Sequence, residues 1–194
     1  RNILQLEDGG FMITGSIEND GQSDACLIKT DANGNEDWVQ TYGGGREDFG
    51  STIQETNDGG FIIFGTTTSF GQGNKDFWLI KTDSQGQEEW SQTFGGTGND
   101  WGNDIQPAKD GGFILIGSTN SFGKGDHDIW LIKINSDGIV EWERTFGGFA
   151  RDNGHSVQQC SDSGFIITGS TSGPADYNLW LIKVDSDGVD EWDN

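Results

Sequence analysis

The chain repeats one sequence pattern four times, with a period of about fifty residues. The third copy reads DGGFILIGSTNSFGKGDHDIWLIKINSDGIVEW from Asp110 to Trp142, and the second reads DGGFIIFGTTTSFGQGNKDFWLIKTDSQGQEEW from Asp58 to Trp90. Two looser copies begin at Asp8 and Asp162, so the first aspartate of the pattern recurs after 50, 52 and 52 residues. A fixed period of this length is typical of repeat architectures, in which each copy folds into one supersecondary unit.

Each copy is predicted to contain four short β-strands, a to d. In the second copy these are residues Ser51–Thr56, Phe61–Thr67, Phe77–Asp83 and Glu88–Phe94, separated by turn sequences rich in Gly, Asn and Asp. No segment carries sustained helical periodicity. Strands b and c are apolar at successive positions, which is typical of strands covered on both faces. Pro107 in strand a of the third copy favours an edge position for that strand, because proline cannot donate to a ladder.

Four-stranded units with two buried faces stack side by side, and such a stack usually closes as a β-propeller. We therefore expect one all-β domain over residues 1–194, a β-propeller with four four-stranded blades of about 51 residues, at about 1–42, 43–94, 95–146 and 147–194. The blades either close as a four-blade ring or form part of a larger propeller, and the complete set of four copies favours the ring. The strand-d tryptophans are predicted to pack between blades, since a tryptophan buries on the order of 150–250 Å². They are Trp38, Trp90, Trp142 and Trp192.

The period and layout resemble the kelch repeat, most clearly in the fourth copy, which reads RDNGHSVQQCSDSGFIITGS and then NLWLIKVDSDGVDEW. The chain departs from kelch in its glycine pairs, which follow strand d rather than strand b, at 43–44, 95–96 and 147–148. The chain also resembles the DGGFIITG…WLIKTD..G…W repeats of large secreted or surface proteins of bacteria and archaea. That resemblance covers essentially all residues and implies an extracellular or cell-surface location. The chain carries no signal peptide and opens in mid-pattern, so we expect a piece of a longer protein.

The charge excludes several classes of partner. The chain has 32 acidic against 11 basic residues and a net charge of −21, so its surface repels phosphate backbones and anionic membranes. No apolar run approaches the ~20 residues needed to span a bilayer. Cys26 and Cys160 each replace another residue of the pattern, so they predict neither a disulfide framework nor a metal set.

The candidate site is expected on the face that carries the b–c and d–a loops, because loops carry function more often than strands. Each d–a loop contains an aspartate two residues before a glycine, and the intervening residue is aromatic in two copies. These pairs are Asp48 with Phe49, Asp100 with Trp101, and Asp152 with Asn153; Phe70 and Phe122 of the b–c loops join them. One interpretation is that each aspartate accepts backbone N–H bonds and fixes its loop. The alternative is a sugar site, in which the carboxylate accepts hydroxyl bonds and the aromatic face packs on the ring.

Metal and catalytic motifs are weak. The segments DSDGVDE (185–191) and DANGNED (31–37) resemble calcium loops, but their oxygens do not recur in the other copies, and a hairpin turn accounts for them better. Calcium stays an alternative ligand, and no other cofactor is indicated. The sequence lacks a nucleophile elbow, a P-loop, CxxC and HExxH, and His127 and His155 occupy different positions of their repeats.

The sequence thus predicts a non-catalytic binding or adhesion module that presents its loop face to a glycan or a surface protein. A purely structural spacer of a large surface protein is the first alternative. A glycoside hydrolase that uses paired loop carboxylates is the second. The repeats could also associate with one another.

Overall fold

The computed structural model describes residues 1–172 and 177–194, and these residues form four antiparallel sheets of four strands each. The first sheet holds β1 (Asn2–Gln5), β2 (Phe11–Asn19), β3 (Gln22–Thr30) and β4 (Glu36–Tyr42). The second holds β5 (Asp48–Glu55), β6 (Phe61–Thr67), β7 (Asp76–Thr82) and β8 (Glu88–Phe94). The third holds β9 (Asp100–Pro107), β10 (Phe113–Thr119), β11 (Asp128–Ile134) and β12 (Val140–Phe146). The fourth holds β13 (Asp152–Gln159), β14 (Phe165–Ser172), β15 (Tyr177–Val184) and β16 (Asp190–Asp193).

In every sheet each strand pairs with the next one along the chain, which is the a-b-c-d order expected from the repeat. The predicted all-β class and the four four-stranded units are confirmed. Within the described residues no helix is long and apolar enough to cross a membrane.

The first strands begin earlier than the pattern suggested. Strand β5 starts at Asp48 rather than Ser51, because Asp48, Phe49 and Gly50 pair with the end of β6 before a bulge shifts the register. Gly50 lies opposite Gly65, where a Cβ atom on Gly65 would stand 1.9 Å from the carbonyl oxygen of Phe49. Glycine is therefore required at the end of the FIIFG run, since any side chain there would collide with the neighbouring backbone.

A lysine of strand c pairs with the aspartate of the a–b turn in each sheet, and this lysine is buried in the second, third and fourth sheets. In the second sheet Lys81 Nζ lies 2.9 Å from the Asp58 carboxylate and 2.8 Å from that of Glu89, and it donates to the Thr82 carbonyl at 3.0 Å. Hydrogen bonds from the Thr56 hydroxyl, from Lys81 and from a backbone N–H lower the pKa of Asp58. The same arrangement recurs with Lys29 between Asp8 and Asp37, Lys133 between Asp110 and Glu141, and Lys183 between Asp162 and Glu191.

Consecutive sheets pack face to face through one repeated interface. We call the face of a sheet that contacts the next sheet its forward face, and the opposite one its back face. Between the second and third sheets, Phe64 and Phe77 of the forward face meet Leu115 and Trp130 of the back face, and all four are buried. Equivalent buried clusters join the first sheet to the second and the third to the fourth. Full burial of one such side chain contributes about 1.5–3 kcal/mol. Because each interface buries several of them, the three interfaces form most of the core.

At each interface a tryptophan of strand d packs on the c–d turn of the following sheet. A methyl group added at Gly86 would lie 2.7 Å from the ring of Trp38, because that ring packs directly on the c–d turn of the following sheet. Trp90 contacts Gly138 and Trp142 contacts Gly188 in the same way. All three turn glycines have φ between 73° and 80°, a conformation that favours glycine. The predicted packing of Trp38, Trp90 and Trp142 between sheets is therefore confirmed. Trp192 of the fourth sheet is 44% exposed, so the described residues do not show the packing that was predicted for it.

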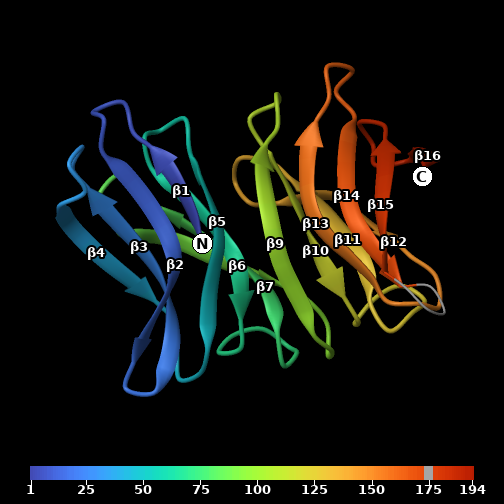
Figure 1. Cartoon of the computed structure of the whole chain (residues 1–194), viewed down its shortest axis with the longest axis horizontal. Helices are drawn as coiled ribbons and strands as arrows, with labels where there is room; N and C mark the ends of the chain where they lie inside the picture. Colours follow the sequence, from blue (N-terminus) through green and yellow to red (C-terminus); the bar gives the residue numbers. More distant parts are fainter. Residues whose placement is uncertain (173–176) are drawn as a thin grey trace.

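The four sheets form an open row. Figure 1 shows them side by side in chain order, with β1 and β4 at one end and β15 and β16 at the other. The first strand of each later sheet, β5, β9 and β13, contacts the sheet before it. The arrangement is propeller-like, but residues 1–172 and 177–194 do not form the closed four-blade ring that the four copies favoured, because the first and fourth sheets lie at opposite ends of the row.

Truncation of an interface tryptophan should destabilise the chain according to its place in the row. Trp90→Ala is expected to lower the free energy of unfolding by about 3 kcal/mol, because it leaves a cavity between two sheets. Trp192→Ala should cost less than about 1 kcal/mol, since its ring is not covered. Urea unfolding of the monomeric chain measures both values. Equal losses for the two variants would contradict the packing described here.

Candidate functional site

The three d–a aspartates begin the first strands of their sheets and are buried. Asp48 and Asp100 are 0% exposed, and Asp152 is 2% exposed. The Asp48 carboxylate accepts bonds from the Gly44 N–H at 2.9 Å and from the Ser69 hydroxyl at 2.7 Å, and also from the Thr67 hydroxyl. These contacts join the d–a connector to the b–c loop. The carboxylate is directed into the protein, which agrees with the loop-fixing interpretation.

Each of these aspartates has a second carboxylate beside it, from strand c of the preceding sheet. Asp76 Oδ1 and Asp100 Oδ2 lie 1.8 and 2.8 Å from the place where a Cβ atom on Gly95 would stand. Asp24 and Asp48 converge on Gly43 in the same way, and Asp128 and Asp152 converge on Gly147. The first glycine of each glycine pair is thus the residue that leaves room for two carboxylates.

In the pair Asp76–Asp100, one oxygen of the Asp76 carboxylate has no hydrogen-bond partner. Asp76 is 1% exposed; its Oδ2 accepts the Gly73 N–H at 3.0 Å, whereas its Oδ1 has no hydrogen-bond partner. Burial raises the pKa of Asp76, and the Asp100 carboxylate raises it further. In the fourth sheet, asparagine (Asn178) stands at the equivalent position in strand c.

The loop phenylalanines lie apart from the d–a aromatics. Phe70 is 44% exposed and its ring lies 5.5 Å from that of Trp78. Phe122 is 43% exposed and lies 5.0 Å from Trp130. Each borders a hollow whose other wall comes from strand d of its own sheet, so neither joins Phe49 or Trp101.

Phe49, Trp101 and Asn153 lie together along the first strands β5, β9 and β13. They are second residues of strands rather than members of loops, and all are half-buried. Two adjoining hollows of about 300 and 220 Å³ share Trp101 and Asn103. We call these two hollows the first-strand groove. Its lining also includes Arg1, Ser51, Thr66, Lys75, Gly102, Ser118, Arg151 and His155.

The groove contains bases but no acids. None of its lining residues is Asp or Glu, although the chain has 32 of them, whereas three of its 11 Lys and Arg residues line the groove. Lys75 Nζ lies 5.6 Å from the centroid of the Trp101 ring, and the guanidinium of Arg1 lies 5.9 Å from that of Phe49. Among the described residues no ion pair involves Lys75 or Arg151. These cations are therefore available to a ligand, unlike the buried lysines of the turns.

The ring of Trp101 packs against that of a buried histidine. The ring of His127 lies 4.8 Å from that of Trp101, and it is 6% exposed. His127 and Lys75 occupy the same position of their repeats, one residue before the strand-c aspartate. The sequence pattern gave no catalytic or repeated-ligand role to His127 and His155, and it did not single out Lys75 or Arg151. The alignment of Ser51, Asn103 and His155 at one repeat position was the available signal for a polar row along these strands.

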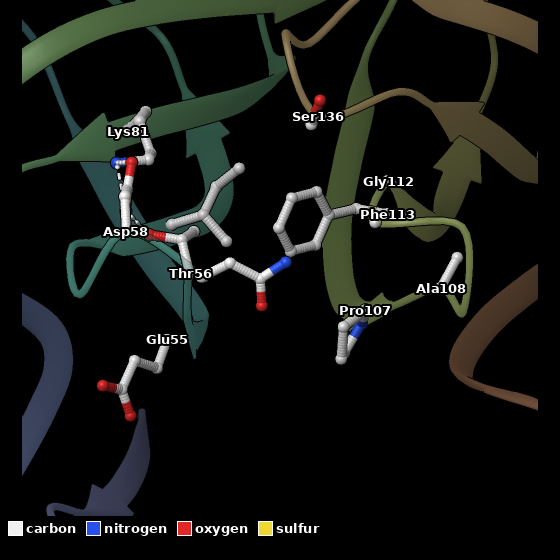
Figure 2. A pocket seen from close by; sticks show the side chains of 12 residues that line it. Glu55, Thr56, Asp58, Lys81, Pro107, Ala108, Gly112, Phe113 and Ser136 are labelled. Carbon is white, nitrogen blue, oxygen red and sulfur yellow. Dashed lines mark hydrogen bonds and ion pairs between the residues drawn. The ribbon is translucent and has the colours of Figure 1, made fainter.

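A further hollow of about 210 Å³ lies between the second and third sheets near the Asp-Gly-Gly turns. Figure 2 shows Lys81 and Asp58 joined on one side of it, with Phe113 and Pro107 on the other. Lys81 is already paired with two carboxylates. This hollow therefore offers apolar surface but no free cation, and we favour the first-strand groove as the candidate site.

The calcium-like segments of the sequence are hairpin turns. Asp31 Oδ1 accepts the N–H groups of Asn33 and Asn35, both at 2.8 Å, and Asp185 accepts those of Asp187 and Val189. In the part of the chain that the structure describes, no three His, Cys, Asp or Glu side chains are grouped to hold a metal ion. Cys26 and Cys160 are free thiols.

The fold and the groove together define a propeller-like repeat protein with a basic, aromatic hollow along its first strands. Neither a protein-family model nor a curated protein matches the chain.

The two kinds of buried aspartate should respond in opposite ways to conversion into asparagine. Because the folded pKa of Asp76 is raised, its ionisation opposes folding at neutral pH, and this cost is relieved as the pH falls through that pKa. Asp76→Asn should therefore increase stability at pH 7 by about 1–2 kcal/mol, since the amide can donate to Asp100, and remove the gain on acidification. Chemical unfolding at several pH values measures both effects.

Asp48→Asn is the matched control, because the Asp48 carboxylate accepts bonds at both oxygens. It should lose about 1–3 kcal/mol at neutral pH. A destabilised Asp76→Asn variant, or one that keeps the pH response of the original chain, would contradict this account of the pair.

Proposed function

We propose that the four sheets are blades of a β-propeller, and that the chain is a non-catalytic binding module whose first-strand groove binds a carboxylate-bearing glycan. The observation that carries the proposal is the composition of the groove. It gathers Lys75, Arg151 and Arg1 without a single acid, in a chain whose net charge is −21.

Charge selects the ligand class. Arginine and lysine bind carboxylates by charge-assisted hydrogen bonds, and the planar guanidinium of Arg151 suits two-pronged contact. At physiological salt the exposed acids more than about 8 Å from a bound anion are largely screened, whereas the groove cations would contact the anion directly. A phosphate polymer would still meet the acidic surface outside the groove, which disfavours nucleic acid.

Shape and polarity favour a sugar over a simple anion. The two hollows of about 300 and 220 Å³ form a surface that is several residues long and crosses three sheets. Trp101 and Phe49 offer apolar surface for a sugar ring. The Ser51 hydroxyl already donates to the Gly102 carbonyl and offers an acceptor, and Asn103 offers its amide oxygen and the amide hydrogen that does not bind the Gly154 carbonyl. A carboxylate-bearing saccharide uses all three kinds of group at once.

A glycoside hydrolase has less support at this groove. Hydrolysis of the usual kind needs two carboxylates about 5–10 Å apart on either side of the glycosidic bond. The groove lining has none. The converging pair Asp76 and Asp100 is buried and does not line the groove.

Binding of the glycan should depend on Lys75, Arg151 and Trp101. Titration calorimetry with an oligogalacturonate probe and with its neutral, reduced counterpart should show binding of the acidic form, weakening as salt is added. Lys75→Gln and Arg151→Gln should each reduce the affinity roughly tenfold, because each removes a charged hydrogen bond. Trp101→Ala should abolish detectable binding.

Lys124→Gln and Phe122→Ala are the controls, since both residues are exposed and lie outside the groove. Circular dichroism verifies that each variant is folded. Equal binding of the acidic and neutral probes would refute the role of the cations. Unchanged affinity in both cation variants would refute the groove as the site.

A further inference from the structure

The two hollows of the first-strand groove repeat one arrangement. We call the hollow of about 300 Å³ the first hollow and that of about 220 Å³ the second hollow. Strands β5 and β9 line the first hollow, and strands β9 and β13 line the second, each with its second and fourth residues. These residues are Phe49 and Ser51, Trp101 and Asn103, and Asn153 and His155. The strand β9 thus serves both hollows with one pair of side chains.

The same hydrogen bond joins neighbouring first strands at both junctions. The Ser51 hydroxyl donates to the Gly102 carbonyl at 2.9 Å, and the Asn103 side-chain amide donates to the Gly154 carbonyl at 2.6 Å. Each bond runs from the fourth residue of one strand to the third residue of the next. Because donor and acceptor hold the same positions of the repeat, the second hollow lies one repeat step beyond the first, in the same register.

Each hollow also receives a basic side chain from the same structural position. Lys75 forms an isolated parallel bridge with Asn99, and His127 forms one with Arg151. Lys75 and His127 are equivalent in the repeat, as are Asn99 and Arg151. The base comes from the first member of the bridge at one junction and from the second member at the next. Lys75 lines the first hollow and Arg151 lines the second.

We propose that the two hollows are successive subsites for a linear acidic polysaccharide whose carboxylates recur along its length, so that one ligand occupies both. This assignment rests on the glycan binding proposed above and narrows the ligand from any carboxylate-bearing sugar to an oligomer. A sugar with one carboxylate can pair with Lys75 or with Arg151, whereas an oligomer repeats its charge as the protein repeats its hollow. Joining two weak contacts in one molecule raises the affinity, because the second contact is then intramolecular.

NMR titration with probes of two lengths tests the proposal. Amide spectra of the chain report both weak affinities and the residues that a ligand affects. Galacturonate, a single sugar, should bind weakly and shift the amide signals of Ser51 in the first hollow and of Asn153 in the second. Tetragalacturonate should bind more tightly by roughly tenfold or more, and the two signals should follow one titration curve.

The two cation variants separate the subsites. With galacturonate, Lys75→Gln should remove the shift at Ser51 and keep that at Asn153, and Arg151→Gln should do the reverse. With tetragalacturonate, each variant should weaken the binding seen at both signals by roughly tenfold, because one ligand spans both hollows. Lys124→Gln is the matched control, since Lys124 is exposed and lines neither hollow, and it should leave both titrations unchanged.

The possible failures are distinguishable. Equal affinity for the two probes, or shifts confined to one hollow at saturation with the tetramer, overturns the paired subsites and leaves glycan binding in place. A Lys75→Gln variant that loses the galacturonate shifts of both hollows also overturns them, because it shows a single site. Absence of groove shifts with either probe overturns glycan binding itself, and the subsites with it.

Discussion

The fold depends on one contact, the packing of a forward face on the back face that follows it. Each contact combines apolar residues of strands b and c of both sheets. It also includes a strand-d tryptophan that packs on a c–d turn glycine of the next sheet, and this glycine has a positive φ. A four-stranded sheet with two apolar faces cannot cover both by itself, so every copy depends on its neighbours. The lysine between two carboxylates holds the Asp-Gly-Gly turn, and the buried d–a aspartate holds the loops at the other end.

Much of this could be predicted from the sequence because it is encoded locally. Glycines such as Gly86 and Gly138 predict the c–d turns. The apolar run of Phe61–Thr67 and its copies predict strands that are covered on both faces. The closure of the row could not be predicted in this way. Four complete copies favoured a ring, but closure depends on the angle between neighbouring sheets, which no single repeat encodes. The exposure of Ile3 and Leu179 reveals the open ends, and it becomes visible only when the same position is compared across all four sheets.

The candidate site was predicted in part. The pattern drew attention to Phe49, Trp101 and Asn153, and the structure brings them to one groove. It could not distinguish the neighbouring aspartates, since a carboxylate that fixes a loop and one that contacts a ligand look alike in sequence. Lys75 and Arg151 were overlooked because the positions they occupy hold other residues in the remaining copies. Their shared location is a consequence of how strands β5, β9 and β13 lie against one another across the sheet junctions.

Amide hydrogen exchange of the monomeric chain measures the central claim most directly, because it reports the coverage of each sheet separately. Among residues 1–172 and 177–194, only the second and third sheets are covered on both faces. The account predicts the slowest exchange in β6, β7, β10 and β11, and faster exchange in the equivalent strands of the first and fourth sheets. Uniform protection across all four sheets, or slower exchange at the ends of the row than in its middle, would contradict the idea that each sheet is stabilised by its neighbours.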